Sequence, residues 1–77
     1  MNNTLLSHLT VGEKGRVLSL TLPADARQRL MEMGLTPGTE CSVVRFAPLG
    51  DPMELRVRGY HLSLRKAEAE GVAIERL

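Results

Sequence analysis

The sequence is poor in aromatic residues, in cysteine and in net charge. Of its 77 residues only Phe46 and Tyr60 are aromatic, and there is no tryptophan, so we expect a core of aliphatic side chains. The lone Cys41 excludes an internal disulfide and fits a reducing compartment. A net charge of +1 argues against nucleic-acid binding on charge alone, because phosphate recognition needs clustered Lys and Arg.

Long apolar runs are absent as well. No stretch approaches the roughly 18 apolar residues that a membrane span requires. Residues 1–15 lack the basic start and the continuous apolar segment of a signal peptide. We therefore expect a soluble, cytoplasmic protein with no direct membrane insertion, and any link to a membrane is expected to come through a partner. The length fits one domain over residues 1–77.

Motifs for catalysis and for metal binding are also missing. There is no GxxxxGK[ST] phosphate loop and no GxSxG nucleophile turn. Cys41 has only His8 or His61 as a potential base, and it lies within a predicted strand, where a packed thiol is the favoured interpretation. These three residues lack CxxC or HxxxH spacing. The sequence thus predicts no enzyme, no cofactor and no metal site, although a loose metal site shared between subunits stays open.

Short stretches with alternating polarity predict a mainly β fold. In residues 16–22, Leu18 and Leu20 are expected to share one face of the strand. In residues 60–65, the alternation predicts that Tyr60 points inward. Such short strands in a small chain imply a strongly bent sheet, and closing the sheet removes edges that promote aggregation. We expect an SH3-like small five-stranded barrel with one or two short helices. The five predicted strands are residues 16–22, 40–46, 53–58, 60–65 and 72–77.

Residues 23–33 give the strongest helical signal. A proline suits the first turn, and an inward apolar stripe at i, i+4 and i+7 begins at Ala26. Gly34 stands where a left-handed residue commonly ends a helix, and Leu35 follows as its apolar clasp. Two further single helical turns are predicted at residues 4–9 and 65–70.

The loop at residues 47–52, Ala-Pro-Leu-Gly-Asp-Pro, is longer and stiffer than a hairpin needs. About two loop residues suffice, and prolines lower the entropy of the free loop. Leu49 either packs back onto the barrel or faces solvent as part of a preorganised recognition edge. The exposed end of the predicted helix adds adaptable apolar contact. The candidate partner-binding residues are Met31, Leu35, Pro48, Leu49, Gly50, Asp51 and Pro52.

Three arginines, Arg56, Arg58 and Arg65, are predicted to share the outer face of neighbouring strands. Small barrels that bind RNA usually add aromatic stacking platforms, whereas both aromatic residues here are expected to face inward. Nearby glutamates dilute the positive charge. A solvated face of mixed charge is therefore favoured, with no nucleic-acid partner, and an RNA-binding barrel remains an alternative. A groove for proline-rich peptides is disfavoured too, since it needs aromatic walls.

Several segments, in order along the chain, resemble the FeoA family. Residues 29–39 (RLMEMGLTPGT) resemble its RLxExGLxPGT segment, and residues 47–52 match its APLGDP loop. Residues 56–65 (RVRGYHLSLR) resemble its RVRGYxLSLR stretch. Residues 9–15 resemble the L-x-x-G-x-x-G segment near the start of the family's sequences. The resemblance covers nearly the whole chain. Cys41 departs from the aliphatic residue expected there, which slightly favours redox or metal sensitivity.

The resemblance implies an SH3-like barrel and a non-enzymatic accessory role in bacterial ferrous iron uptake. The implied partner is FeoB, a membrane transporter that carries a cytoplasmic GTP-binding region. The implied location is cytoplasmic, peripheral to the inner membrane through that partner. A homo-oligomer is a further expectation. Two alternatives stay open: a regulatory module like the SH3-like tail of iron-dependent repressors, and a ferrous-iron sensor or carrier.

Overall fold

A six-stranded antiparallel sheet dominates the structure, a computed structural model that describes residues 3–77. Its helical segments are one long helix and two single turns. The strands are β1 (Asn3–Leu5), β2 (Lys14–Leu20), β3 (Glu40–Phe46), β4 (Met53–Val57), β5 (Tyr60–Leu64) and β6 (Val72–Arg76); the helical segments are η1 (Leu6–His8), α1 (Ala24–Glu32) and α2 (Lys66–Ala69).

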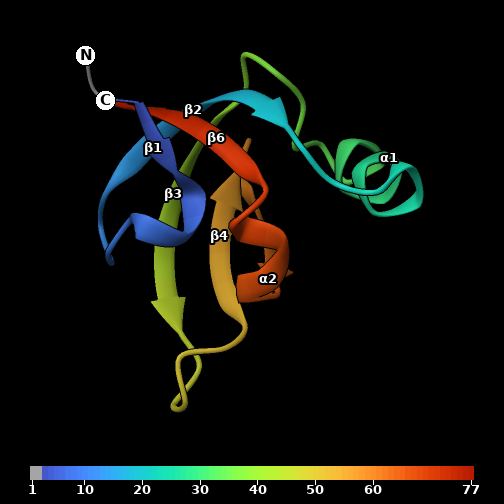
Figure 1. Cartoon of the computed structure of the whole chain (residues 1–77). Helices are drawn as coiled ribbons and strands as arrows, with labels where there is room; N and C mark the ends of the chain where they lie inside the picture. The colour runs from blue at the N-terminus through green and yellow to red at the C-terminus, as the bar shows by residue number, and fades with distance from the viewer. Residues whose placement is uncertain (1–2) are drawn as a thin grey trace.

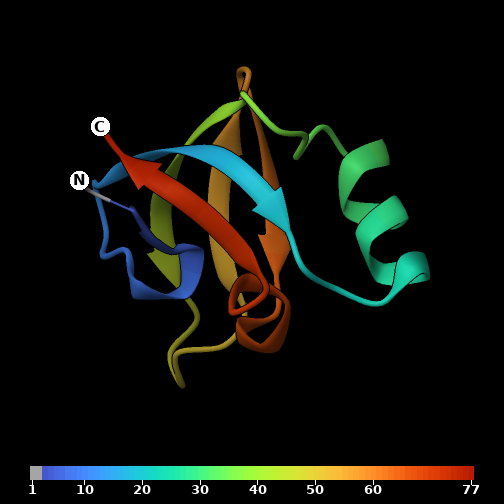
Figure 2. The same cartoon turned by 45° about the horizontal axis from the view of Figure 1, so that its top comes forward.

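The sheet is consistent with the small-barrel fold that the sequence predicts, but within residues 3–77 it has six strands rather than five and is not closed. Its strand order is β1-β6-β2-β3-β4-β5, so β1 and β5 form the two edges. Figures 1 and 2 show β6 and β2 crossing in front of β3 and β4, with α2 at the base of the barrel. The sixth strand, β1, falls in the stretch predicted as a helical turn. It is extended because Thr4 pairs with Ile74 of β6, and only the following residues turn as η1.

The core is aliphatic, and strand alternation explains most of it. On β4, Met53, Leu55 and Val57 are buried while Arg56 between them is exposed. The buried apolar side chains are Leu6, Leu9, Val17, Leu20, Leu30, Leu35, Cys41, Val43, Met53, Leu55, Val57, Leu62, Leu64, Ala69, Val72 and Ile74.

Strand β2 breaks the expected alternation. Val17 is buried and Leu18 is 40% exposed, although Leu20 is buried again. The register between β2 and β6 shifts between Val17 and Ser19, and such an irregularity changes which residues face inward. The prediction that Leu18 and Leu20 share one face is therefore wrong.

Cys41 lies on β3 and points into this core. Its residue is 4% exposed, and burial raises the pKa of its thiol to about 11. The interpretation as a packed thiol is confirmed.

The buried thiol predicts a loss of stability at alkaline pH. Its pKa is about 11 in the folded state and about 8.5 in an unfolded chain. The unfolded chain therefore releases the thiol proton first, and stability is fully present below about pH 8.5 and is lost as pH rises toward 11. Urea unfolding at pH 7 and pH 10.5 should show the parent losing about 2–3 kcal/mol more than Cys41→Val. Identical pH dependence in the two proteins would contradict burial of this thiol.

Helix α1 stands to one side of the sheet, as Figures 1 and 2 both show. It starts and ends within one residue of the predicted bounds. At its end the Leu35 N–H donates to the Leu30 carbonyl oxygen at 3.0 Å, and the Gly34 N–H donates to that of Met31 at 3.0 Å. Gly34 has a φ of 101°, so the predicted glycine stop is confirmed as a Schellman motif. Within residues 3–77 no helix is long and apolar enough to cross a membrane.

Tyr60 connects the barrel to the end of α1. By strand alternation it falls on the same face of β5 as the buried Leu62 and Leu64, yet it is 43% exposed. The prediction that it points into the core is therefore wrong. The reason is its place at the first position of the strand, where its ring reaches the helix and its hydroxyl donates to the Met33 carbonyl oxygen. Phe46 is half-buried and packs against the core.

Candidate functional site: an exposed hairpin tip and a polar recess

The loop at residues 47–52 is a closed hairpin between β3 and β4. The Ala47 N–H donates to the Pro52 carbonyl oxygen at 2.9 Å, and the Gly50 N–H donates to the Ala47 carbonyl oxygen at 2.7 Å. These bonds hold Leu49 at the outer end, where it is 97% exposed. Of the two alternatives for Leu49, the structure has the one that faces solvent.

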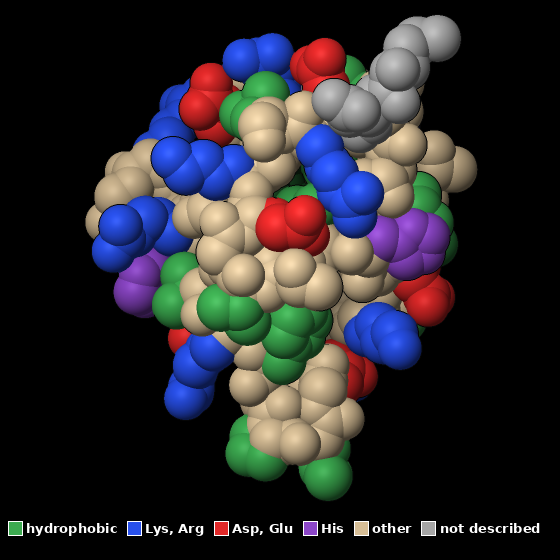
Figure 3. Space-filling view, turned by 90° about the vertical axis from the view of Figure 1, so that its left-hand side faces the viewer, with side chains coloured by type: hydrophobic (Ala, Val, Ile, Leu, Met, Phe, Trp, Pro, Cys, Tyr) green, Lys and Arg blue, Asp and Glu red, His purple; other side chains and the backbone are tan. Residues whose placement is uncertain are grey.

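Pro48, Leu49 and Gly50 together form what we call the tip surface. Both side chains of this surface are exposed, and Figure 3 shows apolar side chains at the end of the projection. In Figure 1 the loop lies at the end of the molecule opposite the C-terminus. A leucine so exposed adds nothing to the core, but a partner that covers it gains about 1.5–3 kcal/mol from burial.

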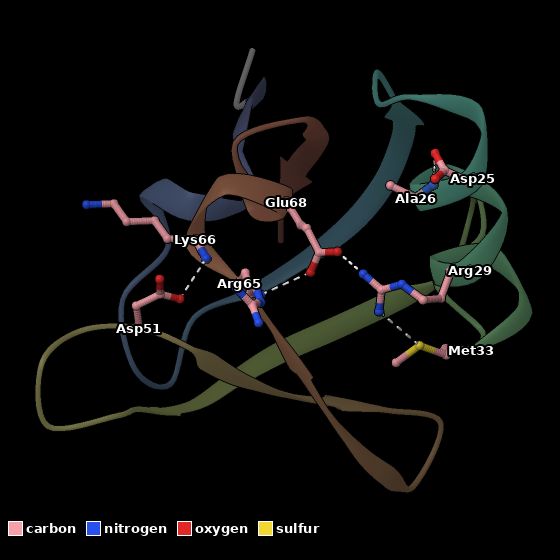
Figure 4. Close-up of polar contacts among 8 residues, drawn as sticks. All are labelled: Asp25, Ala26, Arg29, Met33, Asp51, Arg65, Lys66 and Glu68. Atoms are coloured by element: carbon pink, nitrogen blue, oxygen red, sulfur yellow. Dashed lines mark hydrogen bonds and ion pairs between the residues drawn. The ribbon is translucent and has the colours of Figure 1, made fainter.

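A series of polar contacts ties this loop to α2 and α1 (Figure 4). Asp51 Oδ1 accepts the main-chain N–H of Lys66 at 2.9 Å, where α2 begins. Glu68 Oε1 accepts the Arg65 N–H at 3.1 Å, and Glu68 also forms an ion pair with Arg29 of α1. The hairpin base is thereby fixed relative to the long helix.

The sequence reasoning missed most of these contacts. Arg29 and Glu68 are far apart in the chain, and no local pattern relates them. Only the Glu68 contact with the Arg65 N–H had a local signal, because glutamate is common at the third helical position, where it accepts the N-cap N–H.

A recess of about 590 Å³ lies between the hairpin base and α1. We call it the polar recess, since side chains of both charges line it. Asp51 and Pro52 of the predicted site contribute to it from the loop. Its lining residues are Arg29, Asp51, Pro52, Ser63, Arg65 and Glu68.

The remaining two predicted site residues lie elsewhere. Met31 is 39% exposed and lines a separate recess of about 640 Å³ on α1, away from the hairpin residues. Leu35 has no exposed surface, so the expectation that it offers surface contact is wrong. Its burial follows from its other predicted role, because a residue that clasps a helix end packs inward.

The contact between Asp51 and Lys66 predicts a modest effect on stability. Asp51→Ala should lower the free energy of unfolding by about 1 kcal/mol, since it removes the acceptor of a main-chain N–H. Asp51→Asn keeps an acceptor oxygen in place and should stay within about 0.5 kcal/mol of the parent. Urea unfolding of the three proteins provides the comparison, and equal stability of the alanine and asparagine variants with the parent would show that this bond contributes nothing.

Potential metal ligands are dispersed in the part of the chain that the structure describes. Among residues 3–77 no group of three His, Cys, Asp or Glu side chains is placed to hold a metal ion. Cys41 is buried, His61 is exposed on β5, and His8 Nδ1 lies 3.1 Å from Thr4 Oγ1. The features that remain at the surface, an apolar tip beside a charged recess, are suited to recognising another molecule.

Comparison with known proteins gives a consistent family signal. A model of the FeoA domain matches residues 4–76. The Fe(2+) transport protein A/Fe(2+) transporter FeoB fusion protein of Porphyromonas gingivalis is 34% identical over 70 residues, which cover 91% of this chain and 8% of that protein. The chain thus spans less than a tenth of that relative.

Solved structures share the fold. The FeoA protein of Chlorobium tepidum superposes with a TM-score of 0.92 at 42% identity, covering 96% of this chain and 70% of that one. The Stenotrophomonas maltophilia FeoA, complexed with zinc and described as an SH3 domain protein, gives 0.81 at 30% identity over 94% and 89%. A manganese-dependent transcriptional repressor reaches 0.90 at 13% identity over 100% and 38%, which shows a common fold alone. The SH3-like prediction is confirmed.

Proposed function

The chain belongs to the FeoA family, and on that premise we propose that it serves ferrous iron transport as an accessory protein that binds the cytoplasmic region of the FeoB transporter. The family match supports the accessory role. The Porphyromonas gingivalis fusion protein supports FeoB as the partner, because a domain joined covalently to a transporter acts beside it. Recognition, rather than chemistry on iron, is the contribution we assign to this chain.

The observation that carries the proposal is the exposure of Leu49, 97%, at the end of an internally bonded loop. This leucine contributes nothing to the core of the chain, and the closed loop holds it where a partner can cover it. Prolines and main-chain hydrogen bonds restrict the loop before binding, so less entropy is lost when a partner engages it. A single apolar anchor of this kind is typical of the few residues that dominate an interface.

The geometry suggests how the surrounding residues assist. Asp51, Lys66, Glu68 and Arg29 link the loop to α2 and α1, so the tip surface is held at a fixed position relative to the polar recess. We propose that FeoB contacts the tip surface and the rim of the recess together. The location that follows from this role is the cytoplasmic side of the membrane, peripheral to it through FeoB.

The proposal is tested by retention of FeoB on the chain. The full chain with an affinity tag is incubated with detergent-solubilised membranes that contain full-length FeoB, with guanine nucleotide varied. We expect FeoB to be retained in at least one nucleotide state and the tag alone to retain none. Absence of FeoB from the eluate in every state would overturn the proposal.

A further inference from the structure

Strand β5 is an edge of the sheet, and its backbone orientation follows from the turn that precedes it. Arg58 and Gly59 form a two-residue turn with φ of 50° and 86°, as a type I′ hairpin requires. Such a turn closes on a hydrogen-bonded pair, here Val57 and Tyr60. Along an antiparallel ladder these pairs alternate with non-hydrogen-bonded ones. His61 and Ser63 therefore direct their main-chain N–H and C=O groups away from β4.

No strand of residues 3–77 lies on that outer side of β5. The opposite edge, β1, has 3 residues within the described range 3–77, and short edge strands are a common protection against unwanted pairing. β5 has 5 residues, YHLSL, without proline, and its pairing with β4 shows no bulge. The outer side of β5 faces α1 across the polar recess, which Ser63 and Arg29 both line. Because no strand of the described chain occupies this edge, it is a template onto which an extended segment can add.

The side chains around this edge are positively charged. Arg56 lies opposite His61 across β4 and β5, and Arg65 directly follows the strand. Among the ion pairs of residues 3–77 neither arginine takes part, whereas the nearby Glu54 is paired with Arg45 at 3.0 Å. A strand added here would meet two arginines that form no ion pair in residues 3–77, next to Asp51 and Glu68 of the polar recess.

The polar recess provides room beside the strand. Ser63 and Arg65 line it together with Asp51 and Pro52 of the hairpin base. The outer surface next to β5 is therefore continuous with the base of the loop that carries the tip surface. One partner can contact both features.

We propose that the free edge of β5 binds an extended, acidic segment of FeoB as an additional strand. Its main chain pairs with the N–H and C=O groups of His61 and Ser63, and its Asp or Glu side chains lie against Arg56 and Arg65. This inference rests on the proposed function and adds a second contact to the one at the tip surface.

The test is amide hydrogen exchange in the full chain, alone and bound to full-length FeoB. In the free chain the amides of His61 and Ser63 should exchange fast, while those of Leu62 and Leu64, bonded to β4, exchange slowly. Binding should slow exchange at His61 and Ser63 by at least about tenfold. A complex that forms without slowing at either residue overturns the edge proposal and leaves FeoB binding intact; failure to form any complex overturns both.

A proline variant tests the same edge through affinity. Ser63→Pro removes an outward N–H that β4 does not use, and prolines are tolerated at edge positions of this kind. It should weaken FeoB binding at least about tenfold, while Ser63→Ala, which keeps the N–H, binds like the parent. Equal affinities of two folded variants would contradict the proposal. If Ser63→Pro does not fold, the exchange measurement on the parent decides.

Discussion

Gly34→Ala is expected to lower the free energy of unfolding by about 3 kcal/mol. The backbone φ of 101° at this residue is one that side chains rarely adopt. A Cβ built there would also overlap the Tyr60 hydroxyl, which donates to the Met33 carbonyl oxygen. The variant therefore strains the helix end and disrupts its contact with β5.

Gly12→Ala separates these two causes. Gly12 has a similar φ of 91°, but a Cβ there meets nothing within 4 Å. We expect a cost of about 1–2 kcal/mol from backbone strain alone. Urea unfolding of both variants gives the difference, and equal losses would mean that the contact between Tyr60 and the end of α1 contributes nothing to stability.

Leu49→Asp is expected to weaken FeoB binding by about a hundredfold and to leave folding unchanged. Burial of a leucine is worth about 1.5–3 kcal/mol, and an unpaired carboxylate at the same interface adds a desolvation cost; a hundredfold corresponds to about 2.7 kcal/mol. Because Leu49 is 97% exposed in the free chain and the loop is closed by main-chain bonds, the free energy of unfolding should change by less than about 0.5 kcal/mol.

Leu77→Asp is the matched control for that measurement. Leu77 is 54% exposed and lies at the C-terminus, at the opposite end of the molecule from the loop in Figure 1. The Leu77→Asp substitution introduces the same charge as Leu49→Asp and also removes a leucine side chain. Dissociation constants for the parent and both variants, measured with purified FeoB, should differ only for Leu49→Asp; an equal loss in both would indicate a general effect of negative charge.

Features with local causes were predictable from the sequence. The α1 boundaries, the Gly34 stop and the inward position of Leu30 depend on residues within one or two turns of each other. Features that depend on distant segments were not. β1 is extended because it pairs with β6, at the other end of the chain, and the outward position of Leu18 follows from a register shift against β6.

The site shows the same division. The stiffness of the loop follows from its two prolines, but whether Leu49 packs or faces solvent depends on the space left by the barrel. The sequence left that choice open. The contacts of Asp51 with Lys66 and of Arg29 with Glu68 join segments that meet only in the folded state. Leu35 was assigned both to the helix clasp and to the surface, and packing permits only the first.

The central claim is that the tip surface touches FeoB, and site-specific photo-crosslinking tests it most directly. A photoreactive amino acid replaces Leu49 in one variant and Leu77 in another, and each is irradiated in membranes that contain full-length FeoB. The account predicts a covalent product with the cytoplasmic region of FeoB from position 49 and none from position 77. A product from position 77 alone, with position 49 unreacted, would contradict it.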